Sequence, residues 1–174
     1  MTMKRDYVHA YLSPLGRLTL SCDGEALTGL WFEGQKHFGD TLGEHREEKD
    51  LPVFAQADRW LDLYFSGRIP DFTPPLSMRG TVFRQAVWEQ LLLIPYGQTI
   101  TYGALARRLM EEKGDSRVSA QAVGGAVGHN PVSLIVPSHR VVGANGTLTG
   151  YAGGLEKKFW LLTMERATAE KDKT

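Results

Sequence analysis

The sequence predicts a mixed α+β chain in which a β-rich N-terminal domain is followed by a helical C-terminal domain. Three observations support this fold class. Short alternating apolar segments separated by turn residues fill the first 32 residues, apolar residues recur at helical spacing after residue 80, and a proline-containing stretch lies between the two regions. Because the periodicity changes there, we expect a domain boundary inside the 174-residue chain.

The N-terminal region is expected to form an antiparallel meander. Turn chemistry separates its apolar segments, with Ser-Pro-Leu-Gly at 13–16 and Asp-Gly-Glu at 23–25. The charged stretch 35–52 is expected to be a loop. The three strands are predicted at residues 7–12, 17–22 and 26–32.

A helix and a boundary are expected next. Residues 53–65 place Ala57, Trp60, Leu61 and Tyr64 at helical spacing, and Gly67 provides a stop. Three prolines between residues 69 and 79 then prevent a helix from continuing. The predicted division is an N-terminal domain at 1–78, a C-terminal domain at 79–166 and a polar tail at 167–174.

The C-terminal region has two short helices with clear caps, followed by an unusual third one. Thr81 caps a helix whose apolar face is expected to contain Val82, Phe83, Ala86, Val87 and Leu91. Thr101 caps the next, and Gly114 follows its end. Residues 119–128 are almost all small, which fits close packing against a neighbour or against a large ligand. Two short helices joined by a turn also fit a helix-turn-helix.

The remaining segments lie before and after a Ser-His pair in the sequence. A buried extended run is predicted at 132–136, and Asn145-Gly146 marks a tight turn. An amphipathic helix is predicted at 155–166, with one stripe formed by Leu155, Phe159, Leu162 and Arg166.

Composition limits the function classes. The net charge is zero, but residues 1–78 carry eight Lys and Arg against twelve Asp and Glu, whereas residues 79–166 carry ten against six. The positive half is where a polyanion would bind, although such a split is also common in proteins that bind no nucleic acid. No apolar run approaches the roughly 18 residues of a membrane span, and without a secretory segment we expect a cytoplasmic protein. A single cysteine, Cys22, excludes an internal disulfide and a multi-cysteine metal cluster.

Ser138 and His139 are the first candidates for chemistry. Side chains of adjacent residues rarely point at each other, and Ser138 lies between Pro137 and His139 rather than in a Gly-x-Ser-x-Gly turn. A serine hydrolase is therefore an alternative to be tested, and a capping serine beside a structural histidine is the ordinary explanation.

The surrounding motifs change this interpretation. Pro-Ser-His-Arg-Val-Val-Gly at 137–143, Gly-Tyr-Ala-Gly-Gly at 150–154 and Lys-x-Trp-Leu-Leu-x-x-Glu at 158–165 occur in order. Upstream lie Ile-Pro-Tyr-Gly at 94–97 and Thr-Tyr-Gly-x-Leu-Ala at 101–106. Together they resemble the methylated-DNA-protein-cysteine methyltransferases, which repair guanine alkylated on O6. The resemblance covers nearly all of residues 80–165 and is weaker before them.

The resemblance implies a ribonuclease H-like N-terminal domain, a winged-helix-like DNA-binding domain and no metal or organic cofactor. The family's motif is Pro-Cys-His-Arg, whose cysteine takes the alkyl group, but this chain has Ser138 there. By resemblance, His139 takes the acceptor's proton through a water, Glu165 orients His139, and Asn130 braces the loop. A hydroxyl is far less acidic than a thiol, so we predict that this chain does not transfer alkyl groups. It is either a Cys-to-Ser form of a repair protein or a natural lesion-binding protein that recruits other factors.

The resemblance also implies how DNA is bound. The expected partner is double-stranded DNA containing O6-alkylguanine, bound through its minor groove by a monomer that contacts no membrane, with the damaged nucleotide rotated into a pocket. Tyr102 would help to turn the nucleotide and Tyr151 would stack beside the base. Gln121 stands where many family members have an arginine that fills the gap in the DNA. The candidate DNA and base contacts are Tyr102, Ser119, Ala120, Gln121, Ala122, Gly124, Ser133, Arg140, Val141, Tyr151, Ala152 and Gly153.

Overall fold

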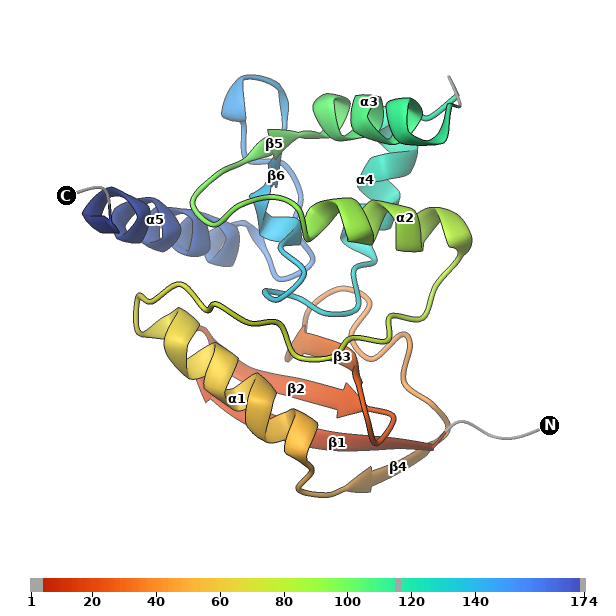
Figure 1. Cartoon of the computed structure of the whole chain (residues 1–174), viewed down its shortest axis with the longest axis vertical. Coiled ribbons are helices and arrows are strands. Elements are labelled where there is room, and N and C mark those ends of the chain that lie inside the picture. Colours follow the sequence, from red (N-terminus) through yellow and green to blue (C-terminus); the bar gives the residue numbers. More distant parts are fainter. Residues whose placement is uncertain (1–4, 115–116, 173–174) are drawn as a thin grey trace. The chain divides into compact units, whose positions relative to one another are not determined.

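The computed structural model describes residues 5–114 and 117–172 (Figure 1). It divides into two compact units. The N-terminal unit contains residues 1–79 together with 131–133, and the C-terminal unit contains residues 80–130 and 134–174. The fold is α+β, with a sheet in the first unit and mainly helices in the second, as the sequence predicts.

The N-terminal unit is built on a four-stranded sheet with the order β3-β2-β1-β4. The expected antiparallel meander is present as β1 (Arg5–Ser13), β2 (Gly16–Cys22) and β3 (Leu27–Phe32). The prediction of a loop over residues 35–52 is wrong at β4 (His45–Glu48), which pairs in parallel with β1. The His-Arg-Glu-Glu sequence of β4 has no apolar alternation, so its strand conformation depends on pairing with β1.

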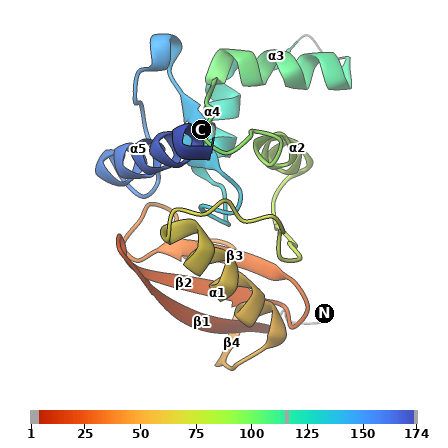
Figure 2. The ribbon, with the colours of Figure 1, turned by 60° about the vertical axis from the view of Figure 1, so that its left-hand side comes forward.

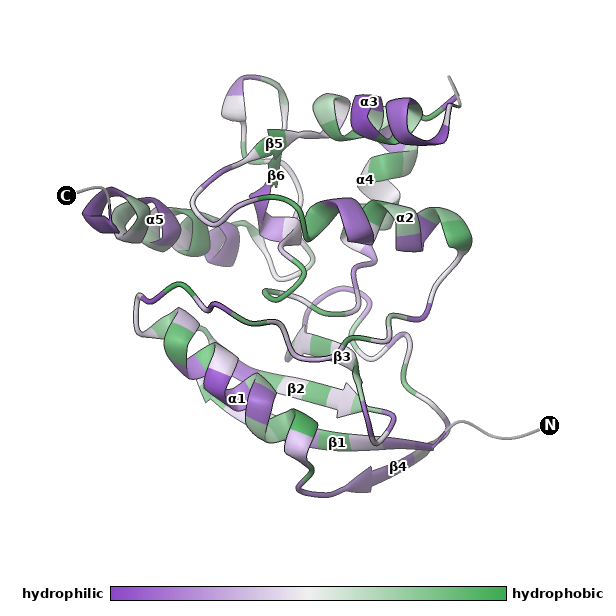
Figure 3. Ribbon diagram, viewed as in Figure 1, coloured by the Kyte–Doolittle hydropathy of each residue, from purple (hydrophilic) through white to green (hydrophobic). Residues whose placement is uncertain are grey.

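Helix α1 (Pro52–Phe65) covers one face of this sheet (Figure 2). Its buried side includes the four residues expected from their spacing, Ala57, Trp60, Leu61 and Tyr64, each at most 6% exposed. Green and purple segments alternate along α1 in Figure 3, as one apolar stripe on a helix requires. Burial of this stripe against the sheet forms the core of the N-terminal unit.

The outer edge of β3 is paired by two segments that lie far from it in sequence. Leu27 exchanges backbone hydrogen bonds with Pro75 and Ser77, at 2.8 and 2.7 Å. Leu30 does so with Pro131 and Ser133, at 2.8 and 2.9 Å. This edge is therefore covered rather than left open to pairing with another chain.

The C-terminal unit contains three short helices, and the caps predicted for the first two are confirmed. They are α2 (Val82–Leu91), α3 (Tyr102–Lys113) and α4 (Ala120–Gly128). The hydroxyls of Thr81, Thr101 and Ser119 accept backbone N–H groups of the first turns of α2, α3 and α4. Gly114 ends α3 with a left-handed φ of 65°.

The predicted inner face of α2 is partly wrong. Val87 and Leu91 are buried, but Val82 is 80% exposed. Trp88 takes the central position instead, and its indole N–H donates to the carbonyl of Ala126 in α4 at 2.8 Å. A large ring with a satisfied donor contributes more buried area than the valine at the start of the helix, where few neighbours surround it.

The segment 132–136 is buried, as expected, but it is not extended. Leu134 adopts a φ of 72°, and residues 133–135 form a turn. The chain then enters a 3₁₀ turn at Ser138–Arg140 and strand β6 (Val141–Val142), which pairs in parallel with β5 (Ile100–Thr101). The expected Asn-Gly turn is present, with left-handed φ at both Asn145 and Gly146.

Helix α5 (Leu155–Asp172) differs from the prediction in both its length and its buried face. It continues six residues past the predicted end at Arg166. The predicted stripe is exposed at Leu155 and Phe159, by 49% and 63%. The buried residues are Lys158, Leu161, Glu165 and Thr168. Hydropathy could not identify this face, because two of its members are charged groups that are buried through hydrogen bonds.

Candidate functional site

Ser138 lies at the start of the 3₁₀ turn, directly after Pro137, and only 5% of it is exposed. Its N–H donates to the carbonyl of Val136 at 2.8 Å, and the N–H of Arg140 donates to the carbonyl of Pro137 at 3.0 Å. These two bonds fix the backbone on both sides of the side chain. The hydroxyl is therefore held in a tight, shielded turn.

Asn130 braces this turn from the end of α4. Its side-chain Nδ2 donates to the carbonyl of Val136 at 2.7 Å and to Oγ of Ser138 at 3.1 Å. Asn130 is 4% exposed, so both bonds are shielded from water. The amide consequently joins the helix to the candidate acceptor.

His139 and Glu165 form the buried pair that the resemblance implies. Nε2 of His139 lies 2.5 Å from Oε2 of Glu165, and both side chains are at most 1% exposed. Burial lowers the pKa of His139, although Glu165 opposes this shift, so the ring is neutral at pH 7. A carboxylate can only accept, so the ring proton lies on Nε2, and Nδ1 keeps the basic lone pair.

Arg140 neutralises the same carboxylate. Its Nε and Nη2 donate to the two oxygens of Glu165 at 2.8 and 3.2 Å, and Nη1 donates to the carbonyl of Ile94 at 2.8 Å. The N–H of Gly97 also donates to Glu165, at 3.2 Å, so that with Nε2 of His139 the carboxylate accepts from four donors. Burial alone would raise the pKa of Glu165, but His139 and Arg140 outweigh it and hold that pKa well below its ordinary range. Glu165 is therefore an ionised acceptor throughout the physiological pH range.

A second buried charge of α5 contacts the loop that follows the site. Nζ of Lys158 donates to the carbonyls of Val141, Thr149 and Gly150 at 2.6, 2.8 and 3.1 Å. Lys158 has no exposed surface. Sequence reasoning missed its role, and that of Gly97, because neither a lysine nor a glycine in a motif reveals which carbonyl or carboxylate it will meet.

The candidate DNA residues of α4 lie mainly on its exposed first turn. Ser119, Ala120, Gln121 and Ala122 are exposed, and Gly124 is half-buried. Tyr102, half-buried at the start of α3, lies near Gly124, since a Cβ placed on that glycine would be 3.8 Å from the tyrosine ring. The start of α4 thus presents small and uncharged side chains.

The candidate base-binding residues are distributed between both units. Arg140 ends the 3₁₀ turn and Val141 follows it, both buried, and the loop residues Tyr151, Ala152 and Gly153 are half-buried. The Tyr151 ring approaches that of His139 edge-on, with centroids 6.4 Å apart. Ser133 instead belongs to the N-terminal unit, where its backbone pairs with Leu30 of β3.

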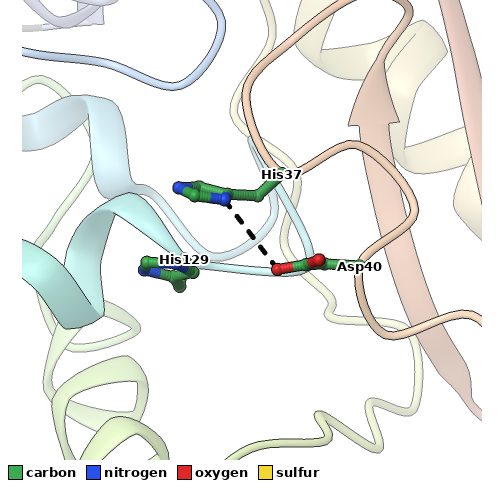
Figure 4. Close-up of side chains that lie close together, drawn as sticks. All are labelled: His37, Asp40 and His129. Atoms are coloured by element: carbon green, nitrogen blue, oxygen red, sulfur yellow. Dashed lines mark ion pairs between the residues drawn. The ribbon is translucent and has the colours of Figure 1, made fainter.

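A polar pair of the N-terminal unit lies in the loop after β3. His37 and Asp40 form an ion pair there, with Nδ1 of His37 3.9 Å from Oδ2 of Asp40 (Figure 4). Both side chains are exposed, and ion pairs in water contribute little. We assign this pair no function.

The described geometry combines a unit of short helices with a buried Asn-Ser-His-Glu arrangement, and comparisons with known proteins identify the class. Residues 82–167 match the 6-O-methylguanine DNA methyltransferase DNA-binding domain, and residues 7–78 match the ribonuclease-like domain of the same proteins. The chain belongs to the 6-O-methylguanine DNA methyltransferase family.

Individual relatives agree with this assignment. Methylated-DNA--protein-cysteine methyltransferases from Haemophilus influenzae and Mycobacterium tuberculosis are each 42% identical to the chain, over 92% and 93% of its length and 86% and 93% of their own. The crystal structure of Mycobacterium tuberculosis OGT in complex with DNA matches with a TM-score of 0.81 and 42% identity, covering 93% of this chain and 94% of that one. These matches support DNA repair, DNA binding and methyl transfer as the activities of the family to which this fold belongs. Among the described residues, no helix is both long and apolar enough to cross a membrane.

Proposed function

We propose that this chain recognises O6-alkylguanine in double-stranded DNA, and that with Ser138 it holds the lesion without accepting the alkyl group. The observation that carries the proposal is the buried hydrogen bond between Asn130 and Ser138, next to the His139–Glu165 pair. The complete arrangement that would serve an acceptor is retained around a side chain that cannot act as one.

The reaction requires a nucleophile at position 138. A thiolate there would attack the alkyl carbon and form a C–S bond while the bond from carbon to O6 breaks, leaving guanine to take up a proton. The lone pair on Nδ1 of neutral His139 suits removal of the thiol proton, through a water, and Glu165 stabilises the resulting imidazolium. A thiol has a pKa of about 8.5 and is within reach of this pair, whereas a serine hydroxyl stays protonated.

DNA recognition is assigned to the C-terminal unit. We infer that α4 enters the minor groove, because Ser119, Ala120 and Ala122 at its exposed start are small. Gln121 would fill the space left by the rotated nucleotide. Tyr102 would act on the backbone next to that nucleotide. The base would be held by Arg140, Val141 and the loop containing Tyr151, Ala152 and Gly153. The protein is proposed to act as a monomer without a cofactor.

Intact-protein mass spectrometry tests the chemistry. The chain and its Ser138→Cys variant are each incubated with a duplex containing O6-methylguanine and with the matched undamaged duplex. We expect a single methyl adduct on the cysteine variant with the damaged duplex, and none on the chain itself. A methyl adduct on the serine form would overturn the prediction that it cannot transfer.

Binding measurements on the same duplexes complete the test. We expect both forms to bind the damaged duplex more tightly than the undamaged one. If the cysteine variant binds the lesion but is never methylated, the protein is a lesion-binding protein of another class and the repair assignment fails. Labelling of Ser138 by a fluorophosphonate would instead indicate a serine hydrolase.

A further inference from the structure

Lys158 is a charged side chain with no exposed surface, and the chemistry outlined above does not use it. An ammonium group has three N–H donors and no acceptor. Here three backbone carbonyls converge on it, those of Val141, Thr149 and Gly150. The match between three donors and three acceptors explains how the charge is tolerated in the interior.

The three carbonyls belong to the two ends of one loop. Val141 directly follows the acceptor turn, and Thr149 and Gly150 directly precede the segment proposed to receive the base. One side chain therefore joins the strand that leaves Ser138–Arg140 to the entrance of residues 151–153. Inside the loop the N–H of Gly143 donates to the carbonyl of Thr147 at 2.8 Å, and the Lys158 ammonium adds the contact that joins the two ends.

Two further contacts connect this clamp to the rest of the site. The ammonium lies 6.0 Å from the centre of the Tyr102 ring at the start of α3, and the Tyr102 hydroxyl interacts with the Thr149 side chain. Lys158 also shares the buried face of α5 with Glu165, which holds His139. The same helix thus orients the acceptor turn through one charge and the loop through another.

We propose that Lys158 is a positioning residue whose ammonium group holds the loop of residues 141–150 in the form that accepts the flipped base, and thereby sets the preference for damaged DNA. The proposal rests on the proposed function, since it assigns lesion recognition to that loop. A neutral amine has two N–H donors and a lone pair, so it can satisfy only two carbonyls and repels the third. Loss of the proton should therefore loosen the loop.

The Lys158 ammonium loses its proton in a pH range in which DNA binding can be measured. Burial lowers the pKa of Lys158 to about 8. The charged and titratable groups around it do not change in the same range. Burial raises the pKa of Tyr102, burial lowers the pKa of His139, and Glu165 stays ionised.

The test measures the dissociation constants of the full chain for a duplex with O6-methylguanine and for the matched undamaged duplex, from about pH 7 to about pH 9. The ratio of the two constants removes effects of pH on general DNA binding. We expect the preference for damaged DNA to fall about tenfold as Lys158 loses its proton. Lys158→Met should have the low preference at every pH, and Lys157→Met, which removes the same charge one position earlier, should behave as the unaltered chain does.

The outcomes separate this inference from the proposed function. If the unaltered chain has no preference for damaged DNA at about pH 7, the proposed function fails. If it has a preference that does not change up to about pH 9, or one that Lys158→Met retains, the role of Lys158 is refuted. A loss of binding to both duplexes in Lys158→Met, with a lowered melting temperature, would make Lys158 merely structural. Where that variant does not fold, the pH profile of the unaltered chain decides.

Discussion

The side-chain amide of Asn130 donates a 3.1 Å hydrogen bond to the hydroxyl of Ser138, from the end of α4 into the turn that carries the candidate acceptor. The same nitrogen donates to the carbonyl of Val136 at 2.7 Å. The position of Ser138 is thus set by a residue eight positions earlier, through two buried bonds. This arrangement makes the site sensitive to changes at Asn130 that leave Ser138 itself untouched.

Asn130→Ala should lower the free energy of unfolding by about 2 kcal/mol, because the Val136 carbonyl and the Ser138 hydroxyl lose a donor in a dry environment. Urea denaturation followed by tryptophan fluorescence measures this. Gln98→Ala removes an exposed amide and should change stability by less than about 0.5 kcal/mol. Equal effects of the two substitutions would contradict a bracing role for Asn130.

Glu165→Gln should lower the free energy of unfolding by about 3 to 5 kcal/mol near pH 7, since Arg140 would be left as a buried charge without its carboxylate. The pH dependence gives a second readout. The folded-state pKa of Glu165 is held below its ordinary value of 4.5, so its stabilisation is present above about pH 4.5 and is lost as the pH falls further.

Denaturation of the unaltered chain should therefore show a steeper loss of stability below about pH 4.5 than denaturation of Glu165→Gln. Glu156→Gln, which changes an exposed carboxyl in the first turn of the same helix, serves as the control. If the stability of the unaltered chain and that of Glu165→Gln fell in parallel below about pH 4.5, the pKa of the buried Glu165 carboxyl would not be depressed.

Gly97→Ala should destabilise the C-terminal unit by about 2 kcal/mol or more. Gly97 has a φ of 81°, and a Cβ there would lie 2.7 Å from the Cβ of Ala169 while its N–H donates to Glu165. Gly114→Ala is the matched control, because Gly114 also has a left-handed φ, of 65°, but a Cβ there would meet no atom of the described residues within 4 Å. Thermal melting should show a larger fall in melting temperature for Gly97→Ala than for Gly114→Ala. A larger fall for Gly114→Ala would count against this steric account.

Gln121→Arg should tighten DNA binding and steepen its salt dependence. One additional phosphate contact increases the slope of log K against log salt by about 0.9. Gln121 is exposed on the first turn of α4, where an arginine can reach the backbone of a groove-bound duplex. Fluorescence anisotropy at several salt concentrations measures the slope, with Gln98→Arg as a control of equal charge. An unchanged slope in Gln121→Arg would place this residue away from the DNA.

Local signals predicted the elements of the chain well. The three strands of the meander, α1 and its buried residues, and the caps of α2 and α3 follow from alternation, helical spacing and hydroxyl side chains. Each of these depends on residues within a few positions of one another. Non-local pairing was not predictable in the same way, as β4 shows, because its charged sequence is a strand only beside β1.

Sequence motifs also indicated Asn130, Ser138, His139 and Glu165 as one site, but only through resemblance to a family. Periodicity gave the wrong face for α5. Its exposed Phe159 has the hydropathy of a core residue, and its buried Lys158 that of a surface one. The reversal arises because three carbonyls and a histidine–arginine pair, all from other segments, satisfy the two buried charges of the helix.

The sequence by itself determined the fold class, the caps of α2 and α3, and the presence of Ser138 in a motif that resembles the family's Pro-Cys-His-Arg. The tertiary structure alone decided which nitrogen of His139 faces the carboxylate and which loop Lys158 holds. The physical reason is the distance along the chain over which the interactions act. Propensity and capping act within one turn, whereas burial of a charge depends on donors and acceptors that folding brings together from distant parts of the chain.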